Sequence, residues 1–379
     1  MQRNTASSWR ILGLTVLALG SPVAANAADC SSSTTTSGKV IRLTADCTTT
    51  ATINVPGGFT FDGQNHTITA LDPPAGSFQG AVLKALPGAA VTIRKVKIEA
   101  NNLAVACHSG DARLAGILFD GASGKVTNTS VLSLNQGASG CQEGLAISIR
   151  NAPFDGTNPA TKRVSVTNNI VRGWQKGGII ANGDVDVEIT GNDVGESATQ
   201  HNLSANSVQL AYGAKGKIQN NDIAGNQNLI PGGADGSSAM AILIYGAPGA
   251  IVHNNRIGGN SNIGIGVYED IFFGNGGSVG VKITQNRVFD EGADDGDISE
   301  DTGIAVDQES RPKSSVRTNT IRCFDVPVEI EGGSPTTLGN NKVQNCATNS
   351  VAALRAAASG TKAVAAKAKQ ASGPSPIKP

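Results

Sequence analysis

The sequence predicts an all-β solenoid, a single body built from stacked coils of the chain. Three observations lead to this prediction. A six-residue pattern recurs seven times between residues 164 and 343. The chain has 47 glycines and few helix signals, which favours turns and short strands. Aromatic residues make up only 4% of the chain, so we expect a core of stacked Val, Ile, Leu and Ala side chains.

The repeated pattern is an apolar residue, two variable residues, Asn, one variable residue and a second apolar residue. Successive copies are separated by 23, 29, 34, 31, 33 and 22 residues, which fits coils joined by loops of different length. The copies cover residues 166–171, 189–194, 218–223, 252–257, 283–288, 316–321 and 338–343, and their shared asparagines are Asn169, Asn192, Asn221, Asn255, Asn286, Asn319 and Asn341.

The two apolar residues of each copy lie five positions apart, so a continuous strand would direct them to opposite faces. A bend between them lets both point inward. Asn is the non-glycine residue that most readily adopts the left-handed backbone conformation, so we expect the shared Asn to form this bend. Stacked from coil to coil, the asparagines can also hydrogen-bond to one another in a ladder. We therefore interpret them as architecture.

A second short strand recurs once per coil, most clearly at residues 207–212, 241–245, 264–268 and 303–307. When the strands are aligned at their last residue, that position is mixed and the one before it is always apolar. By alternation, the apolar row faces the interior and the mixed row faces outward. The mixed row is Asp120, Arg150, Asn182, Tyr212, Tyr245, Tyr268, Asp307 and Glu331, and the apolar row is Phe119, Ile149, Ala181, Ala211, Ile244, Val267, Val306 and Ile330.

Each coil thus reads strand, turn, strand, Asn bend, strand and variable loop. Over about residues 50–345 this order resembles the single-stranded right-handed parallel β-helix of the pectate-lyase-like superfamily. The resemblance implies a substrate groove along the outward face of the strand just aligned, walled by the variable loops. It also implies an activity on polysaccharides.

Composition divides the chain into four parts. Residues 1–27 are typical of a secretory signal peptide, because Arg3 and Arg10 precede a short apolar run and small residues follow it. We expect an N-terminal cap over residues 28–57, which must cover the first open coil, and the β-helix over residues 58–346. Residues 347–379 form an Ala-, Lys- and Pro-rich stretch that we expect to be a flexible tail. The protein is therefore expected to be secreted or periplasmic.

All six cysteines follow the expected signal peptide, and an even number suits an oxidising compartment. A metal site is the alternative, but no two cysteines are separated by two residues and the chain has only four histidines. We expect sequential disulfides, joining Cys30 to Cys47, Cys107 to Cys141 and Cys323 to Cys346.

The charge balance bears on the binding partners. With 30 basic and 30 acidic residues the chain has no net field to attract nucleic acid. The apolar run of the signal peptide is too short to span a bilayer, so we expect no membrane segment. We expect a monomer whose partner is a polysaccharide.

The outward row supplies the candidate site, because all three tyrosines of the chain fall within it. A Tyr side chain can stack on a sugar ring or transfer a proton through its hydroxyl. A lyase or epimerase acting on a uronate must neutralise the carboxylate and move protons at the reacting carbon and oxygen. The expected catalytic residues are Tyr212, Tyr245, His201 and Asp307, and the expected substrate-binding residues are Arg150, Asn182, Tyr268 and Glu269.

Two alternatives stay open. Asp307 with Glu331, or Glu269 with Asp270, can form the two carboxylates of a glycoside hydrolase. The tyrosines can instead form a packed ladder in a noncatalytic polysaccharide-binding protein. Apolar residues two positions before the mixed row also face outward by alternation, so we expect loops to cover part of this face; they are Leu118, Ile180, Leu210 and Leu243.

The acidic run at residues 290–301 is the one candidate for a cofactor site. Its carboxylates can bind Ca²⁺, although the ligand spacing of an EF-hand is absent and a solvated acidic loop is the alternative. We expect no other metal or cofactor.

Overall fold

The structure is a computed structural model that describes residues 28–100, 103–137, 139–152, 160–198, 203–228, 238–270, 276–290, 301–307, 313–331 and 336–346. The expected signal peptide, the expected tail, His201 and most of the acidic run lie outside these residues. The described part contains one short 3-10 helix, η1 (Gly110–Ala112), and no helix long and apolar enough to cross a membrane.

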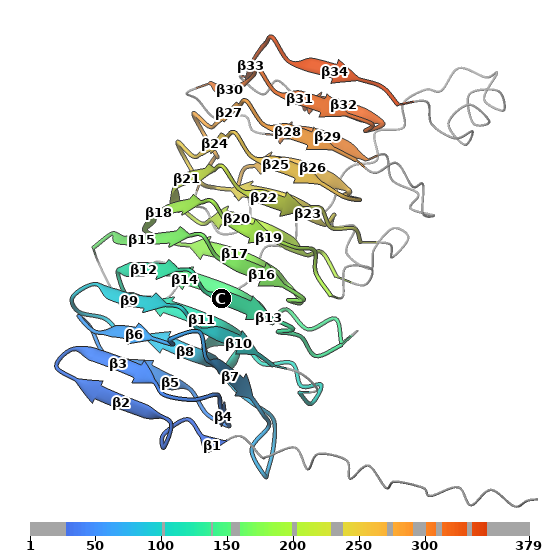
Figure 1. Ribbon diagram of the computed structural model, residues 1–379. Coiled ribbons are helices and arrows are strands. Elements are labelled where there is room, and N and C mark those ends of the chain that lie inside the picture. Colours follow the sequence, from blue (N-terminus) through green and yellow to red (C-terminus); the bar gives the residue numbers. More distant parts are fainter. Residues whose placement is uncertain are drawn as a thin grey trace, which may run out of the picture.

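Three long sheets run along the molecule, as the coil pattern predicts (Figure 1). Sheet A has 12 strands: β1 (Ala28–Asp29), β4 (Cys47–Thr49), β7 (Thr67–Ala70), β10 (Lys97–Glu99), β13 (Ser130–Leu132), β16 (Ile170–Arg172), β19 (Asp193–Val194), β22 (Asp222–Ala224), β25 (Arg256–Gly258), β28 (Arg287–Phe289), β31 (Thr320–Arg322) and β34 (Lys342–Gln344).

Sheet B also has 12 strands: β2 (Thr34–Ser37), β3 (Val40–Leu43), β6 (Thr60–Asp62), β9 (Val91–Arg94), β12 (Gly124–Thr127), β15 (Lys162–Thr167), β18 (Val185–Thr190), β21 (Lys215–Gln219), β24 (Ile251–His253), β27 (Lys282–Thr284), β30 (Ser314–Arg317) and β33 (Thr336–Gly339). Sheet C has 10: β5 (Ile53–Val55), β8 (Ala81–Ala85), β11 (Ala115–Asp120), β14 (Leu145–Arg150), β17 (Gly177–Asn182), β20 (Asn206–Ala211), β23 (Met240–Tyr245), β26 (Ile263–Tyr268), β29 (Thr302–Asp307) and β32 (Val326–Ile330).

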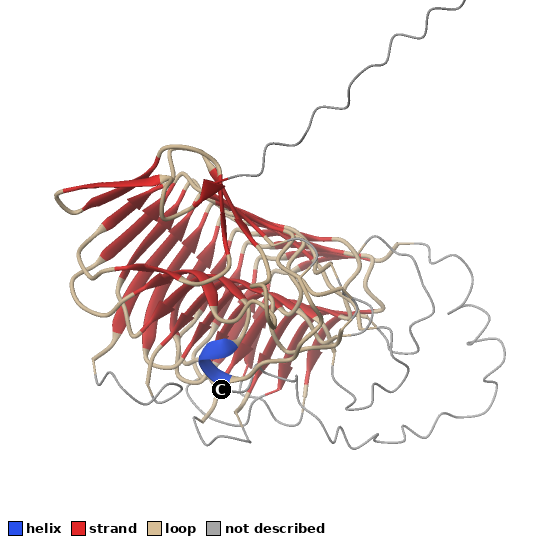
Figure 2. Cartoon of the chain, turned by 90° about the horizontal axis from the view of Figure 1, so that it is seen from below, coloured by secondary structure: helices blue, strands red, loops and turns tan. Residues whose placement is uncertain are grey.

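From β5 onward each coil contributes one strand to every sheet, in the order C, B, A, and each strand pairs in parallel with its counterpart one coil away. The fold is therefore a right-handed parallel β-helix, whose three sheets enclose one interior (Figure 2). Branched aliphatic side chains from all three sheets fill that interior in continuous columns. One such column is Ile117, Ile147, Ile179, Val208, Ile242, Ile265 and Ile304, all fully buried.

The predicted Asn ladder is present between sheets B and A. Asn255 shows the pattern: its Oδ1 accepts hydrogen bonds from the backbone N–H and the Nδ2 of Asn221, at 3.0 and 2.9 Å. Its Nδ2 donates to Asn286 Oδ1 at 3.0 Å and to the Ile218 carbonyl at 2.9 Å. The amide thus uses both donors and two acceptor sites, which a buried side chain requires.

The expected backbone conformation of the ladder residue is wrong. Positive φ occurs one residue earlier, for example at Asn254 with φ 51°, and not at Asn255 itself. The earlier residue turns the chain, so that the next side chain enters the interior and can stack on its neighbours. The residues with positive φ at this position are Asn168, Gly191, Asn220, Asn254, Gln285, Thr318 and Asn340, so the turn accepts several residue types whereas the ladder does not.

The stack starts earlier than predicted. Strands β3, β4 and β5 fall within the expected cap, yet they pair in parallel with β6, β7 and β8 of the next coil. Only β2 departs from the pattern, because it pairs antiparallel with β3 and covers the end of sheet B. A short hairpin therefore protects this open edge from pairing with another chain.

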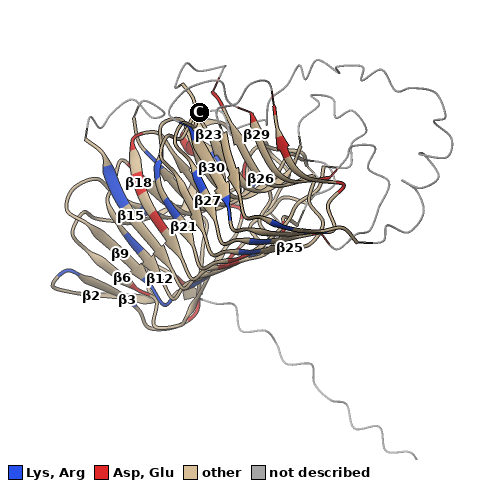
Figure 3. Ribbon diagram, turned by 90° about the horizontal axis from the view of Figure 1, so that it is seen from above, with Lys and Arg blue, Asp and Glu red and all other residues tan. Residues whose placement is uncertain are grey.

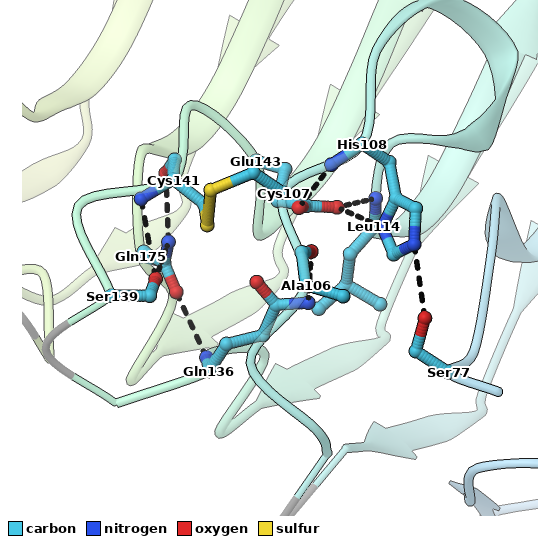
Figure 4. The surroundings of a disulfide bond; sticks show 10 residues. All are labelled: Ser77, Ala106, Cys107, His108, Leu114, Gln136, Ser139, Cys141, Glu143 and Gln175. Carbon is cyan, nitrogen blue, oxygen red and sulfur yellow. Dashed lines mark hydrogen bonds and ion pairs between the residues drawn. A yellow bond between two sulfur atoms is a disulfide. The ribbon is translucent and has the colours of Figure 1, made fainter.

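The predicted disulfide pairing is confirmed, and no cysteine is free. Cys30–Cys47 ties the first residues to β4, Cys107–Cys141 joins loops of neighbouring coils, and Cys323–Cys346 closes the last coil. The Cys107–Cys141 bond is held in a dense polar network (Figure 4). There the Gln175 side-chain amide donates to the Cys141 carbonyl at 2.7 Å and to Ser139 Oγ at 2.8 Å.

The ladder predicts a difference between two neighbouring asparagines. Asn255→Leu removes four buried hydrogen bonds and leaves two donors of Asn221 without this acceptor, so we expect a loss of about 2–4 kcal/mol. Asn254→Gly is the matched control, because glycine accepts positive φ at no steric cost. Thermal unfolding should show a clear fall in Tm for the first variant alone, and equal Tm values would contradict the assigned roles.

Candidate functional site

The outward face of sheet C differs from that of sheet B. In β15 and β18 every outward residue is at least partly exposed, and both strands carry charged residues (Figure 3). In β14, β17, β20, β23 and β26 all six residues are buried, including those that point outward. Side chains on this face therefore lie in a medium of low polarity, where charges and hydrogen bonds act more strongly than in water.

The register of sheet C corrects the outward row at one coil. Ala211, not Tyr212, pairs with Asn182 on one side and Tyr245 on the other. Tyr212 follows the strand with φ 58° and donates its backbone N–H to the Tyr245 carbonyl at 3.0 Å. The prediction that Tyr212 belongs to the row is wrong.

The expectation for Leu210 is wrong for the same reason, a shift of register by one residue. Leu210 faces the interior and is fully buried in the core. Burying Leu instead of Ala in the core gains apolar area, which gives a physical reason for this register. Gln209 takes the outward position between Ile180 and Leu243. These two apolar residues and Leu118 are buried on the outward face, as expected.

A charged cluster occupies the N-terminal end of this face. Arg150 donates to Asp120 at 3.0 and 3.2 Å and also pairs with Asp111. Lys84 lies 2.8 Å from Asp120 and 3.7 Å from Asp111. The guanidinium predicted to neutralise a substrate carboxylate is thus already matched by two carboxylates of the protein.

A buried amide network follows. Gln209 Nε2 donates to Asn182 Oδ1 at 2.8 Å, and Asn206 Nδ2 donates to Gln209 Oε1 at 3.1 Å. The exposed fractions of these side chains are 3% or less. The predicted substrate-binding residue Asn182 is therefore held by its neighbours in the next coil.

The three tyrosines lie in one apolar cluster with Met240 and Leu243. The rings of Tyr212 and Tyr245 meet edge to face, with centroids 5.7 Å apart. Tyr268 lies back over Gly266, where a Cβ would come within 2.5 Å of its ring. Exposed fractions of 2%, 1% and 7% for Tyr212, Tyr245 and Tyr268 show a packed cluster rather than an open platform.

Burial has a chemical consequence for these phenols. It raises the pKa of Tyr212, with Tyr245 and Asp270 adding to the shift. It also raises the pKa of Tyr268, where Glu331, Glu329 and Asp307 add to it. Both phenols stay protonated near neutral pH, so they can donate a proton or a hydrogen bond but are poor bases.

Three carboxyl groups lie together at the C-terminal end of the face. Asp307 pairs with Tyr268 in the sheet, and Glu331 follows Ile330, the partner of Val306. Burial raises the pKa of Glu331, and Asp307, Glu329 and a side-chain hydrogen bond with Asp307 raise it further. Such a pair favours a state in which one carboxyl is protonated and its neighbour is ionised.

Sequence reasoning had paired Asp307 with Glu331 but missed Glu329, which strict alternation along β32 places on the same face.

Glu269 is partly exposed, and its backbone N–H donates to the Asp307 carbonyl at 3.3 Å. Asp270 is buried and donates its N–H to the Gly276 carbonyl. His201 lies outside the described residues. Within the described ranges, no group of three or more His, Cys, Asp or Glu is arranged to hold a metal ion.

A separate hollow of about 330 Å³ lies over sheet A. Arg172, Asp193, Asp222, Arg256 and Phe289 contribute to its lining. Arg256 lies 2.9 Å from Asp222 and 4.8 Å from the Phe289 ring centroid, so its charge is satisfied from two sides. This hollow was not predicted. Asp193, Asp222 and Arg256 each come directly after a ladder Asn, at a position that we had treated as variable.

The comparisons agree with the architecture. The family described as "Right handed beta helix region" matches residues 156–347, about half of the chain, and the chain therefore belongs to this family. No match is found among curated proteins.

Solved structures with a similar course of the chain include two β-helix proteins. The periplasmic alginate epimerase AlgG is 11% identical over 82% of this chain and 80% of its own, with a TM-score of 0.40. The GH136 lacto-N-biosidase from Eubacterium ramulus is 10% identical over 80% of this chain and 65% of its own, with a TM-score of 0.42.

Tyr245 can be tested as a packing residue. Tyr245→Ala leaves a cavity in the apolar cluster and should lower stability by about 3–5 kcal/mol, whereas Tyr245→Phe keeps the ring and should cost about 1 kcal/mol or less. Thermal unfolding distinguishes the two. Equal losses would mean that the hydroxyl, rather than the ring, stabilises the cluster.

The carboxyl pair predicts a pH dependence. Because the pKa of Glu331 is raised above its ordinary value of 4.5, the folded protein holds this proton more tightly than the unfolded chain does. The stabilisation is complete below that ordinary value and is lost as the pH rises through the folded-state pKa. The side chain of Glu331→Gln is neutral at every pH. The Tm of this variant, relative to that of the wild type, should therefore increase as the pH rises from about 4 to about 8.

The exposed Glu188 on sheet B supplies the control for this measurement. Glu188→Gln should show a weaker trend. Parallel Tm curves for the wild type and Glu331→Gln would exclude a raised pKa at Glu331.

Proposed function

We propose that this β-helix protein is carbohydrate-active and cleaves glycosidic bonds with the carboxyl pair Asp307 and Glu331. The observation that carries the proposal is the placement of these two carboxyls in neighbouring coils, beside Tyr268 and Glu329, with the pKa of Glu331 raised. Two carboxyl groups held in different protonation states supply the acid and the base or nucleophile that glycoside hydrolysis needs.

The roles follow from the two environments. Glu331, protonated, donates its proton to the glycosidic oxygen as the bond to the leaving sugar breaks. Asp307, ionised, attacks the anomeric carbon, and water assisted by Glu331 then releases the sugar. Residues in neighbouring coils are about 4.8 Å apart, which favours direct attack over a mechanism that places water between the carboxylates. The Tyr268 phenol supplies a protonated donor beside the pair.

The residues on this face fit β-elimination or epimerisation less well than they fit glycoside hydrolysis. Arg150 already pairs with Asp111 and Asp120, and the pKa values of Tyr212 and Tyr268 are raised by burial. Three clustered carboxyls also disfavour an anionic uronate at this end. The glycoside hydrolase alternative therefore becomes the leading proposal, with a neutral or weakly charged polysaccharide as the substrate.

We also propose that the protein is located outside the cytoplasm. The three disulfides fit a protein that folds in an oxidising compartment. Together with the expected signal peptide, they support a secreted or periplasmic protein that meets polysaccharide outside the cytoplasm.

A panel of neutral and acidic polysaccharides tests the activity. Reducing ends and the ultraviolet absorbance of unsaturated sugars should be measured on the same samples. We expect reducing ends without absorbance. Reducing ends with absorbance would instead indicate a lyase, and binding without either product would indicate a noncatalytic protein.

Variants then test the assigned residues. Asp307→Asn and Glu331→Gln should each lower turnover about a thousandfold on the substrate that the panel identifies, because each removes a group that acts in the transition state. Glu188→Gln on sheet B is the matched control and should retain full turnover. Activity unchanged in both site variants would place the reaction elsewhere on the molecule.

A further inference from the structure

Three polar residues from separate loops form a second constellation, near the N-terminal end of the stack (Figure 4). Ser77 Oγ lies 3.0 Å from His108 Nε2, and His108 Nδ1 lies 3.1 Å from Glu143 Oε2. The loops that carry them precede strands β8, β11 and β14, so three successive coils bring these residues together. A hydroxyl, an imidazole and a carboxylate in this order have the connectivity of a nucleophile, its base and the group that orients the base.

The carboxylate is fixed in place. The Glu143 side chain is fully buried and also accepts the backbone N–H groups of His108 at 2.9 Å and Leu114 at 2.7 Å. A carboxylate that faces Nδ1 favours the imidazole tautomer with its proton on that nitrogen. Nε2 is then an acceptor for the Ser77 hydroxyl.

Two further links hold the loops. The Cys107–Cys141 disulfide joins the residue before His108 to a residue two positions before Glu143. The Asp72 carboxylate accepts the N–H of Phe78 at 2.7 Å and that of Ala104 at 2.7 Å, which ties the loop of Ser77 to that of His108. The geometry is thus fixed by a covalent bond and by hydrogen bonds to two carboxylates, as positioned catalytic groups require.

The constellation is also accessible. The His108 side chain is 11% exposed, and Ser77 is half-buried. In the described part of the chain, the backbone N–H groups of Ser77 and Gln79 donate to no protein acceptor. Such N–H groups next to a nucleophile are the donors that an oxyanion needs.

We propose that Ser77, His108 and Glu143 form a nucleophilic serine centre that cleaves carboxylic esters. Ser77 Oγ bonds to the ester carbonyl carbon while His108 Nε2 takes the hydroxyl proton. The carbon–oxygen bond to the alcohol then breaks, and the alcohol leaves with that proton. Water, deprotonated by His108, adds to the acyl-serine and releases the carboxylic acid, and the proton returns to Ser77.

This centre is distinct from the carboxyl pair of the proposed glycosidase. Strands β8 and β29 are separated by seven steps in sheet C, which is about 34 Å at the spacing of stacked strands. The ester proposal stands without the proposed function, since no residue is shared. The substrate of the ester centre that we propose is an O-acyl group, not a glycosidic bond.

A fluorophosphonate probe and p-nitrophenyl acetate test the proposal on the disulfide-bonded protein. We expect the probe to phosphonylate Ser77, as shown by mass spectrometry of the Ser77 peptide. We also expect the protein to hydrolyse p-nitrophenyl acetate. Ser77→Ala should abolish labelling and lower kcat/KM at least about a hundredfold.

Ser109→Ala is the matched control, because Ser109 is exposed beside His108 and its side chain makes no cap hydrogen bond. It should keep both labelling and turnover. Labelling of the wild-type protein decides the matter even if Ser77→Ala does not fold. An unlabelled Ser77 in the folded wild type, or hydrolysis that persists in a folded Ser77→Ala, would show that the three residues only clamp the loops and would overturn the proposal.

Discussion

The stacking of each coil on the next, at the hydrogen-bonding distance of about 4.8 Å, is the constraint on which the rest of the molecule depends. The Asn ladder makes this stacking specific, because each amide satisfies all its hydrogen bonds only if its neighbours lie one coil above and below. A shift of register would leave buried amides without partners, at a cost of about 1–3 kcal/mol for each group. Residues 22 to 34 positions apart are therefore held as direct neighbours.

The two outer faces use this constraint differently. Sheet B carries exposed charges that water screens, and its outward side chains contribute little beyond solubility. Between β14 and β26, sheet C holds its outward side chains out of water, and an amide network and a tyrosine cluster lie there in a row. The carboxyl pair follows at the partly exposed C-terminal end of the same face. Burial on both sides between β14 and β26 is the feature by which sheet C differs from sheet B.

The sequence allowed prediction of whatever repeats with the coil. The Asn ladder and the inward columns followed from spacing, because the repeat itself puts these residues together. The three disulfides were expected from the sequential order of the cysteines. The position of Tyr212 was not predicted correctly, because the register of β20 is shifted by one residue. Leu210 rather than Ala211 enters the core, and the repeated pattern does not reveal this choice. The position of the left-handed residue also depended on local geometry that composition does not determine.

Loops set a different limit. Ser77, His108 and Glu143 come from three segments of unrelated sequence, and no periodicity connects them. A short pattern search cannot find such a constellation, because its geometry arises from the stacking of coils and the Cys107–Cys141 bond. The disulfide itself was predicted, but that prediction did not point to His108 or Glu143.

A stack in which each coil contacts its neighbours also separates its functions. Coupling between coils passes through nearest-neighbour interfaces, so a change in the loops before β8 and β14 has little effect on the packing around β29 and β32. The proposed ester centre and the proposed glycosidase pair can therefore change independently while the ladder keeps both in register. The separation also makes substitutions at the two sites additive in stability, since no residue or partner is shared between them.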